Sequence, residues 1–386
     1  MAYFRNSTVN LLNLHYGMHA AAVAGGGAFY LVYLLKAGLP PAGVLASIAL
    51  ILAGRFLIRP LIIPAAARWG LRALVFAGVL VSALQYFVLA EVQGLGPMLF
   101  ALIALGAVGD TIYWSTYHAY FAALGDAEHR GHQLGAREAI GALVGVVSPL
   151  IAGWLLVSFG PRVAFGVTAA VAMLSALPLL GAPDVPVAKR VPGAFAASRL
   201  GFFLFMADGW TAAGAILVWQ IALFQSLSEN YMAYGGALAL AAFAGAIGGL
   251  LLGRHIDAGH GGRAVWLAFG VFAFVIALRA AASGHPALAV IANALGAVAN
   301  CLYIPTTMTA VYNAAKQSPC VLRFHVAAEG GWDIGGASGL LLAAALALLG
   351  FPLWAGVLLS LLGVAANFFL LRRYYAAAPR AAQAAA

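Results

Sequence analysis

Long runs of apolar residues, each closed by a short polar or turn-forming segment, recur along almost the whole chain. A helix needs about 20 mainly apolar residues to cross the hydrocarbon core of a bilayer, and the pattern predicts about twelve such helices. The predicted spans cover residues 10–35, 42–65, 73–90, 97–124, 135–159, 163–180, 200–227, 232–253, 264–283, 286–314, 326–349 and 353–371.

The connections between the spans are short, and the longest polar stretch lies near the middle of the chain. We therefore predict an N-terminal bundle of six helices over residues 1–181, a cytoplasmic linker over 182–198 and a C-terminal bundle of six helices over 199–386. The first residues run directly into an apolar span without a small-residue cleavage site. We therefore expect a retained first helix rather than a removed signal peptide.

Composition indicates that lipid surrounds these helices. Hydrophobic residues make up 64% of the chain and charged residues 8%, and a soluble domain of this kind would lack polar groups to cover its surface. No connection is long enough for a soluble catalytic or nucleic-acid-binding domain, and the phosphate-binding pattern G-x-x-x-x-G-K-[ST] is absent from the sequence. We expect an all-α membrane protein that is not an enzyme, has no cofactor and binds no nucleic acid.

The charge distribution predicts the orientation of the spans. The formal net charge is +9. If both termini are cytoplasmic, only Lys36, Arg162 and Arg279 fall near the outer side, as the positive-inside rule requires. We therefore expect a multi-pass protein of a bacterial-type cytoplasmic (inner) membrane with both termini inside. The basic residues then placed inside are Arg5, Arg68, Arg72, Arg130, Arg137, Lys189, Arg190, Arg199, Arg254, Arg263, Lys316, Arg323, Arg372, Arg373 and Arg380.

The two halves of the sequence resemble each other weakly. The segment GDTIYWSTYHAYFAAL, at 109–124, aligns with ANCLYIPTTMTAVYNA, at 299–314, with an offset of 190 residues. The alignment pairs Tyr113 with Tyr303 and Thr116 with Thr306. Internal symmetry of this kind is typical of transporters built from two repeated bundles.

One connection carries a more specific motif. Between the eighth and ninth predicted spans, the sequence GGLLLGRHIDAGHGGRAV begins at Gly248. Glycines allow close helix approach, and a carboxylate can bind a neighbouring helix N-terminus. The positions Gly249, Gly253, Arg254 and Asp257 resemble the loop signature of the major facilitator superfamily. The resemblance implies two pseudo-symmetric six-helix bundles that work by alternating access, with Asp257 helping to lock them together on the cytoplasmic side.

The corresponding loop of the first half is degraded. Arg59 stands where the first glycine is expected, Pro64 where the arginine is expected and Ala67 where the aspartate is expected. We therefore do not expect a symmetric pair of locks. The fifth span contains SPLIAG at 148–153, which is similar to the G-P-x-x-G-G helix motif of exporters in the family.

Ionisable side chains within the spans are candidates for function, because the membrane interior makes them costly. Arg55 and Arg59 lie one turn apart in the second span and share a face. Asp110 lies about halfway along the fourth span, at the depth expected for Arg55. Two interpretations are open, namely a structural ion pair between two helices of one bundle, or an anion-binding Arg55 beside a proton-titrating Asp110.

The resemblance adds further cavity candidates. In the family, the first, fourth, seventh and tenth helices line a central cavity, which implies cavity positions for His19, Asp110 and Asp208. The fourth span is also rich in aromatic and hydroxyl side chains, of which Tyr113 and Thr116 are the candidates for the cavity wall. Such a cavity would suit a small amphipathic solute.

The histidines pose the question of a metal site. Imidazole and thioether groups such as His15, Met18, His19 and His118 suit copper, but the sequence has no repeated Met/His ladder. We therefore expect no metal, and we expect His15 to be packed and hydrogen-bonded.

Acidic residues also occur near the predicted start of the eleventh span. Glu329 is expected in the first helical turn, where it would interact favourably with the helix dipole. Asp333 lies one turn deeper, beside Trp332, and is a candidate for the interface between the bundles.

These features predict a secondary active transporter that moves a small organic solute by alternating access, coupled to protons. We expect a monomer whose partners are a small-molecule substrate and the lipid bilayer. The alternatives are a lipid flippase or drug exporter, and a non-transporting membrane sensor. The candidate substrate and proton-coupling residues are Arg55, Asp110, Tyr113, Thr116, Asp208, His19 and Asp333, and the candidate gating residues are Gly249, Gly253, Arg254 and Asp257.

Overall fold

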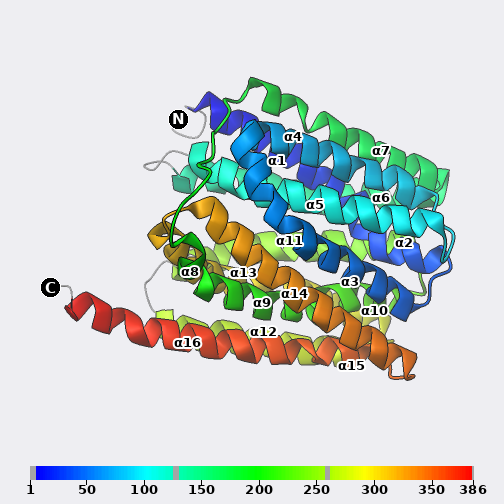
Figure 1. The fold of residues 1–386 in the computed structure, drawn as a ribbon. Coiled ribbons are helices and arrows are strands. Elements are labelled where there is room, and N and C mark those ends of the chain that lie inside the picture. Colours follow the sequence, from blue (N-terminus) through cyan, green and yellow to red (C-terminus); the bar gives the residue numbers. More distant parts are fainter. Residues whose placement is uncertain (1–5, 125–129, 257–260, 385–386) are drawn as a thin grey trace.

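Helices make up nearly all of the described chain, as the apolar runs predict. The structure, a computed structural model, describes residues 6–124, 130–256 and 261–384. Within these ranges it describes only the helical backbone, and not the side chains, of residues 122, 130–139, 252–256, 261–263 and 377–384. Within these ranges it contains helices and no strands (Figure 1).

The helices follow one another with short connections in both halves. The first half contains α1 (Ser7–Ala24), η2 (Gly26–Phe29), α2 (Tyr30–Lys36), α3 (Pro41–Ile58), η3 (Arg59–Leu61), α4 (Ile62–Ala90), α5 (Pro97–Leu124), α6 (Arg130–Phe159), α7 (Pro161–Leu174) and η4 (Leu177–Gly181). The remainder contains α8 (Ala194–Ala197), α9 (Arg199–Ala212), η5 (Ala213–Val218), α10 (Trp219–Ser226), α11 (Tyr231–Ile256), α12 (Gly261–Ala282), α13 (Pro286–Gln317), α14 (Val321–Leu348), α15 (Leu353–Leu358) and α16 (Ser360–Ala384).

Eleven helical segments of the described chain are long and apolar enough to cross a membrane. One of them, Pro41–Ala90, contains 50 residues, and as one helix it would be about 75 Å long, more than twice the hydrocarbon core of roughly 30 Å. It breaks at Gly70, whose φ of 78° suits glycine and few other residues. This segment therefore supplies two crossings, which brings the described chain to the twelve expected. The protein is a multi-pass membrane protein.

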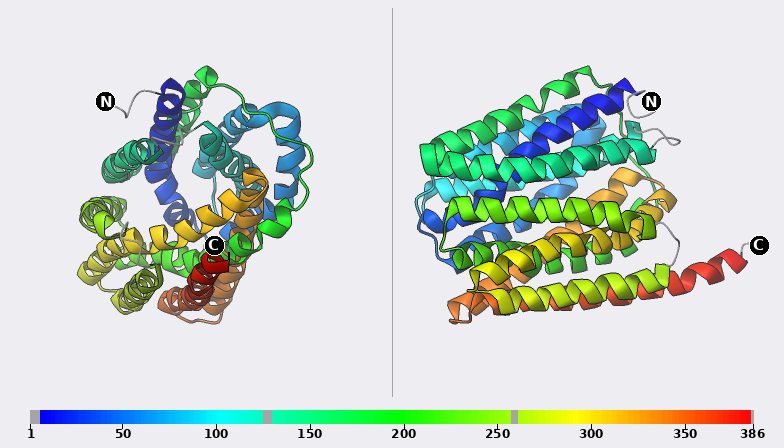
Figure 2. Two further views of the ribbon diagram at one scale, coloured as in Figure 1. Left: turned by 90° about the vertical axis from the view of Figure 1, so that its left-hand side faces the viewer. Right: turned by 180° about the vertical axis from the view of Figure 1, so that it is seen from behind.

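The crossings form two bundles of six helices. Seen end-on in Figure 2 (left), the N-terminal half, blue to the first green helix α7, lies on one side and the C-terminal half, from the later green helices to red, on the other. The contact between the bundles includes α3 packed against α14 and α6 packed against α11. These pairs come from corresponding places in the two halves, as the internal repeat suggests.

The SPLIAG segment of the fifth span lies in the α6–α11 contact. A Cβ atom on Gly153 would lie 2.9 Å from the Tyr231 carbonyl oxygen, and one on Gly235 would lie 2.6 Å from the Pro149 carbonyl oxygen. Both distances are shorter than a side-chain carbon tolerates, so only glycine allows the two backbones to approach this closely.

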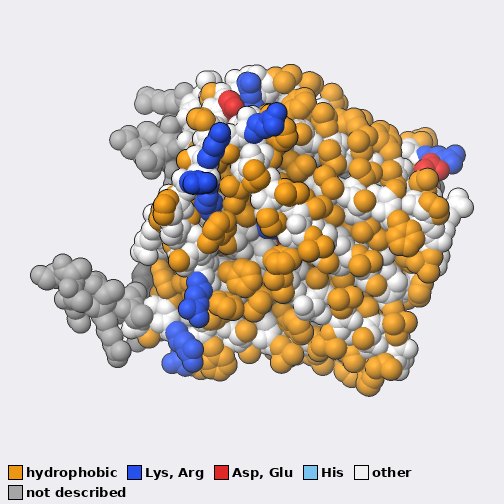
Figure 3. Space-filling model, in the orientation of Figure 1, with side chains coloured by type: hydrophobic (Ala, Val, Ile, Leu, Met, Phe, Trp, Pro, Cys, Tyr) orange, Lys and Arg blue, Asp and Glu red, His pale blue; other side chains and the backbone are white. Residues whose placement is uncertain are grey.

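Charged side chains lie mainly at the two ends of the molecule, and hydrophobic side chains cover most of the face between them (Figure 3). The opposite end from the termini carries two exposed ion pairs, Lys36–Glu229 at 3.4 Å and Arg162–Glu91 at 2.7 Å. We call the end at which α1 begins and α16 ends the basic end. Its described basic residues are Arg68, Arg72, Lys189, Arg190, Arg199, Lys316, Arg323, Arg372 and Arg373.

Helix α14 packs closely against α9 through glycines. Cβ atoms on Gly331 and Gly335 would collide with the carbonyl groups of Phe202 and Met206. Small residues that bring backbones into contact are the usual basis of helix association in membranes, where lipid tails are as apolar as the side chains. Because α14 also packs against α3, it connects the two bundles.

The linker between the halves is bound to both of them. The Asp184 carboxylate accepts a hydrogen bond from the Arg72 backbone N–H at 3.0 Å, at the start of the third crossing. From the other half, Arg323 donates to the Ala188 carbonyl oxygen at 2.8 Å. Asp184 thus supplies a carboxylate at a helix N-terminus, a group that the first-half loop lacks because Ala67 replaces its aspartate.

The predicted gating motif lies only partly within the described chain. Asp257 falls outside the described residues, and of Gly253 and Arg254 only the helical backbone at the end of α11 is described. A Cβ atom on Gly249 would face α13, 4.0 Å from the Cys301 sulfur. The locking role of this motif therefore stays a prediction.

Candidate functional site

Four charged side chains meet where the two bundles touch. Arg55 lies in α3 and Arg59 begins η3, which continues α3, whereas Glu329 and Asp333 lie in α14. In each pair the residues are four positions apart, so both members share one helix face. Because α3 packs against α14, the basic face meets the acidic face. We call these residues the charge cluster.

Asp333 is the centre of the charge cluster. Arg55 Nε lies 3.0 Å from Asp333 Oδ1, and Arg59 Nε donates to Asp333 Oδ2 at 2.8 Å. Arg59 Nη2 contacts the same oxygen. Glu329 Oε2 lies 3.5 Å from Arg55 Nη2 and 3.8 Å from Arg59 Nη1. Arg59 Nη1 also donates to Ser115 Oγ at 2.8 Å, which adds α5 to the arrangement.

The charge cluster is almost entirely buried. The exposed fractions are 7% for Arg55, 2% for Arg59 and 0% for Asp333, and the Glu329 side chain is 12% exposed. Two positive charges balance two negative ones. Burying charges costs desolvation energy, and removing one member leaves its partner uncompensated in a medium of low dielectric constant. The contact between α3 and α14 therefore depends on the complete set of charges.

A cavity of about 410 Å³ adjoins the charge cluster, and Arg55 forms part of its wall. The Arg55 guanidinium also lies 5.6 Å from the centre of the Trp332 ring, across the bundle interface. The N-terminal bundle supplies most of the wall and the C-terminal bundle the rest. The lining residues are His19, Ala22, Val23, Gly27, Ala28, Tyr30, Leu31, Ile48, Ile51, Leu52, Arg55, Ser82, Gln85, Tyr86, Asp110, Trp114, Ala172, Leu217, Gln220 and Trp332.

Asp110 shares this cavity with Arg55 but is not its ion-pair partner. Ser82 Oγ donates to Asp110 Oδ1 at 3.3 Å, and the carboxylates paired with Arg55 come from α14. The interpretation of Arg55 and Asp110 as a structural ion pair within one bundle is therefore wrong. The sequence pattern locates the ionisable groups on their helices, but it does not reveal that a helix of the other half packs against α3.

Tyr113 and Thr116 lie inside the N-terminal bundle and not on the cavity wall, contrary to expectation. The Tyr113 hydroxyl is 3.1 Å from His15 Nε2. His15 Nδ1 lies 2.7 Å from the Ser175 carbonyl oxygen, which only accepts, so Nδ1 carries a proton and Nε2 of the neutral ring accepts from the tyrosine. Thr116 Oγ1 donates to the Ile112 carbonyl oxygen at 2.5 Å. Both hydroxyl groups are thus satisfied within their own bundle.

Asp208 is likewise hydrogen-bonded inside its own bundle and is not among the residues that line the cavity. The Tyr303 hydroxyl donates to Asp208 Oδ1 at 2.9 Å, and Asn367 Nδ2 donates to the Tyr303 oxygen at 3.1 Å. Tyr303 is the repeat counterpart of Tyr113. In each half, therefore, a tyrosine of the fourth crossing contacts an ionisable residue of the first, His15 in one half and Asp208 in the other.

Sequence reasoning missed the role of Glu329. We expected it in a first helical turn, but α14 begins at Val321, so Glu329 lies two turns inside the helix and faces the arginines. Hydropathy marks the apolar part of a helix, whereas the backbone continues as a helix beyond it. A usable signal was present, because Glu329 and Asp333 have the same four-residue spacing as the two arginines.

Arg279 lies in the last turn of α12, on the side of the molecule opposite the basic end, and its side chain is buried. It is 6% exposed, its Nη1 donates to the Ala215 carbonyl oxygen at 2.5 Å, and its guanidinium lies 5.4 Å from the centre of the Trp219 ring. Ala215 belongs to the π-helical segment η5, whose wider turn disrupts the regular hydrogen-bond ladder. Arg279 therefore stabilises an irregular segment of the seventh crossing.

The cavity can bind an anion and can hold protons. A guanidinium presents a fork of donors that matches carboxylate and phosphate groups, and an anion bound to Arg55 would compete with the carboxylates of α14. Asp110 and His19 supply titratable groups to the same cavity. His19 Nδ1 has no hydrogen-bond partner within the described chain. The aromatic rings of Tyr30 and Trp114 offer apolar contacts for the rest of a solute.

Comparison with known proteins agrees with this architecture. A family profile described as Major Facilitator Superfamily matches residues 16–201. No match is found among curated protein sequences.

Solved structures with the same fold cover almost the whole chain. The POT-family transporter PepTSo is similar with a TM-score of 0.69 and 12% identity, over 96% of this chain and 98% of that one. The nucleoside transporter NupG gives 0.69 and 13%, over 96% and 99%. The human organic anion transporter MFSD10 (TETRAN) gives 0.64 and 18%, over 96% and 99%. At these identities the similarity concerns the fold. Residues 16–201 thus match the major facilitator superfamily, and the whole chain shares the fold of these membrane transporters.

Proposed function

We propose that the protein is a secondary active transporter that carries a small amphipathic organic solute with an anionic group, by alternating access and with protons as the coupling ion. One observation supports this most directly. Arg55 belongs both to the wall of the cavity and to the charge cluster that joins the bundles. A solute in the cavity can therefore influence the contact on which the rocking of the bundles depends.

An anionic group bound to Arg55 would draw the guanidinium away from α14. Asp333 and Glu329 would then depend on Arg59 alone, since all their ion pairs in the described chain are with the two arginines. A buried carboxylate that has lost part of the neighbouring positive charge is stabilised by taking up a proton or by moving away from the buried site. Either outcome weakens the contact between α3 and α14 and opens the cavity toward the basic end.

Asp110 is the proposed proton-binding group. Its carboxylate lies in the same cavity as Arg55 but outside the charge cluster, so its protonation leaves the four-charge balance intact while changing the charge that a solute meets. Among the similar structures are transporters described as carrying peptides, nucleosides and organic anions. This range supports a small organic solute, and Arg55 is the reason for preferring an anionic one.

We further propose that the basic end is cytoplasmic, in a bacterial-type inner membrane, with residues 1–181 and 199–386 as the rocking bundles and 182–198 as their linker. Most basic residues outside the crossings then face the cytoplasm. Reporter fusions in successive connections test the orientation, and an active periplasmic reporter at the basic end would contradict it.

The transport proposal is tested with purified protein. A thermal-shift screen against small organic acids, peptides and nucleosides identifies a ligand, because binding to the folded state raises the melting temperature. Uptake of that ligand into proteoliposomes is then driven by an imposed pH gradient. We expect Asp110→Asn to abolish gradient-driven uptake and to retain ligand exchange without a gradient. We expect Arg55→Gln to lose the thermal shift for anionic ligands.

Asp208→Asn is the matched control, because it makes the same change at a membrane carboxylate outside the cavity, and we expect it to keep gradient-driven uptake. Wild-type uptake by Asp110→Asn would make the proton-binding role wrong. An unchanged thermal shift in Arg55→Gln would make the anion-binding role wrong.

A further inference from the structure

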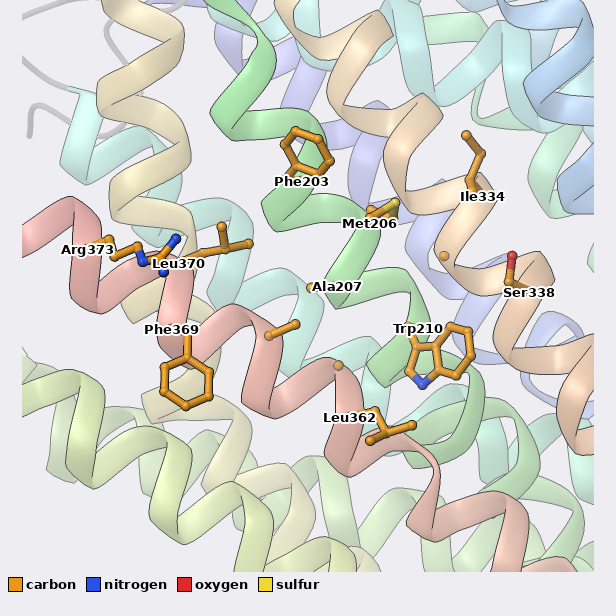
Figure 4. A pocket seen from close by; sticks show the side chains of 13 residues that line it. Phe203, Met206, Ala207, Trp210, Ile334, Ser338, Leu362, Phe369, Leu370 and Arg373 are labelled. Atoms are coloured by element: carbon orange, nitrogen blue, oxygen red, sulfur yellow. The ribbon is translucent and has the colours of Figure 1, made fainter.

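A second large hollow lies on the outer face of the C-terminal bundle, away from the central cavity. It is a groove of about 750 Å³ with α9 as its floor and α14 and α16 as its sides (Figure 4). Trp210 lies at one end, where its indole N–H donates to the Leu359 carbonyl oxygen at 2.9 Å. Arg373 lies at the other end, which is the basic end of the molecule.

Small and large residues both line this groove. Ala207, Gly335, Ser338, Gly363 and Ala366 contribute to its lining beside the larger side chains of Met206 and Trp210. Larger apolar residues stand at the rim and are open to the surroundings, with exposed fractions of 38% for Phe203, 60% for Leu362 and 61% for Phe369. In a membrane protein such a surface faces lipid. The groove is therefore open to the acyl chains of the bilayer.

Arg373 gives the groove a charged end. It has no ion-pair partner among the residues that the structure describes. Its neighbour Arg372 differs, since it lies 5.2 Å from the centre of the Trp266 ring and 5.7 Å from that of Phe368 and is directed away from the groove. A free guanidinium at the end of an apolar channel is complementary to a molecule with an anionic head and an apolar tail.

We propose that this groove binds an anionic phospholipid of the leaflet at the basic end, with its phosphate on Arg373 and one acyl chain along α9. The depth fits one leaflet. From Leu362 to Arg373 the helix rises about 16 Å, which is half of a hydrocarbon core of roughly 30 Å. A free phosphate would use only Arg373 and leave the apolar walls to other lipids, whereas a phospholipid uses both.

The headgroup supplies the selectivity. Transfer of an acyl chain from bulk lipid to an apolar groove gains little, because lipid tails are as apolar as the side chains. The attraction of one basic residue to an anionic surface corresponds to a factor of about five in binding. The groove also borders Gly335 and Ile334 of α14, close to Asp333. A lipid bound there would therefore contact and stabilise the helix that carries the two carboxylates of the charge cluster.

Native mass spectrometry of the purified, delipidated protein tests the proposal. Phosphatidylglycerol and phosphatidylcholine with identical chains are added, and the retained lipid is counted. We expect the wild type to retain phosphatidylglycerol about fivefold better, and Arg373→Gln to remove this preference. Ala366→Leu, which fills the groove, should lower retention of phosphatidylglycerol.

Two neighbours provide the controls. Arg372→Gln removes the same charge from the same helix, and Ala365→Leu adds the same side chain at an exposed position that does not line the groove. Both should behave as the wild type, and melting temperatures establish that all variants are folded. Equal retention of the two lipids by the wild type would overturn the proposal. So would equal effects of Arg373→Gln and Arg372→Gln, or of Ala366→Leu and Ala365→Leu.

Discussion

At the bundle interface, each buried charged side chain is stabilised by the opposite charges of its neighbours. Asp333 contacts both Arg55 and Arg59 and is fully buried. Without it, Glu329 alone would face the positive charges of both arginines. A buried ion pair contributes modestly when complete, yet the loss of one partner is expensive because the other charge remains in a medium of low dielectric constant. The stability of this interface is therefore more sensitive to single than to paired substitutions.

The first prediction concerns Asp333. We expect Asp333→Leu to lower the free energy of unfolding by about 3–5 kcal/mol, since it leaves two arginines with one carboxylate. The double variant with Arg59→Met keeps one arginine opposite Glu329 and should lose less. Melting temperatures of the purified proteins in detergent provide the comparison. Equal losses in the single and double variants would contradict a charge-balance account.

Asp184 is a second residue whose role is visible only in space. It caps the start of the third crossing from the linker, and removal of such a cap costs about 0.5–2 kcal/mol. We therefore expect Asp184→Ala to lower the melting temperature, whereas Asp184→Asn, which keeps a capping oxygen, stays near the wild type. If both substitutions had the same effect, the side-chain cap would not be the reason.

Glu91 connects stability to pH at the end opposite the basic end. The hydrogen bond from Arg162 lowers the pKa of Glu91 below its usual value. Since the unfolded value is about 4.3, the pair stabilises the fold above that pH, and this contribution is lost as the pH falls through the lowered folded pKa. The melting temperatures of the wild type and Glu91→Gln should differ slightly at pH 6 and converge at low pH. A difference that persists in strong acid would contradict this assignment.

At the scale of elements, α14 has two faces with different chemistry. Its glycines bring the backbone against α9, and its carboxylates meet the arginines of α3. A single helix thus belongs to one bundle by close packing and contacts the other through charges. Close packing fixes α14 within its own half, while a charge contact can be exchanged for protons or a bound anion.

Gly335 tests the packing face. A Cβ atom there would collide with the Met206 carbonyl group, so we expect Gly335→Ala to destabilise the protein by about 1–3 kcal/mol. Gly236 in α11 is the matched control, because a Cβ atom there meets nothing within 4 Å. Gly236→Ala should be neutral or stabilising by up to about 1 kcal/mol, as alanine favours the helix. The reverse order of stability would contradict the close contact between α9 and α14.

At the scale of the whole molecule, contacts between the bundles lie on both sides of the central cavity. The charge cluster lies toward the basic end. At the opposite end, Lys36 pairs with Glu229 at 3.4 Å, and the Phe29 ring lies 5.3 Å from that of Tyr234. Alternating access requires that these two sets of contacts open in turn. The exposed pair at the opposite end contributes little to stability and therefore opens at small cost.

Cross-linking tests this movement. In a background with Cys301 and Cys320 replaced by serine, a short reducible cross-linker between cysteines at positions 36 and 229 joins the two bundles. We expect it to stop transport and reduction to restore transport. Cysteines at positions 91 and 162 provide the control, since Glu91 and Arg162 pair within the N-terminal bundle, and their cross-link should leave transport intact. Equal effects of both cross-links would contradict rocking bundles.

The membrane class, the crossings and the helices that carry ionisable groups can be predicted from the amino-acid sequence alone. These properties follow from local patterns, because about 20 apolar residues suffice for a crossing and glycine, proline and charge mark its ends. The 50-residue segment Pro41–Ala90 is an example, since its polar middle predicts two spans and the break at Gly70 divides it.

Which of these groups contact one another depends on how the helices pack in three dimensions. Arg55 pairs with Asp333 and not with Asp110, Tyr113 faces His15 and not the cavity, and Asp184 reaches a helix start more than a hundred positions away. Each outcome depends on how close two helix backbones approach and on how each helix is rotated about its axis. Hydropathy barely changes with that rotation in a helix that is apolar all round, so partners across the bundle interface follow from packing and not from sequence spacing.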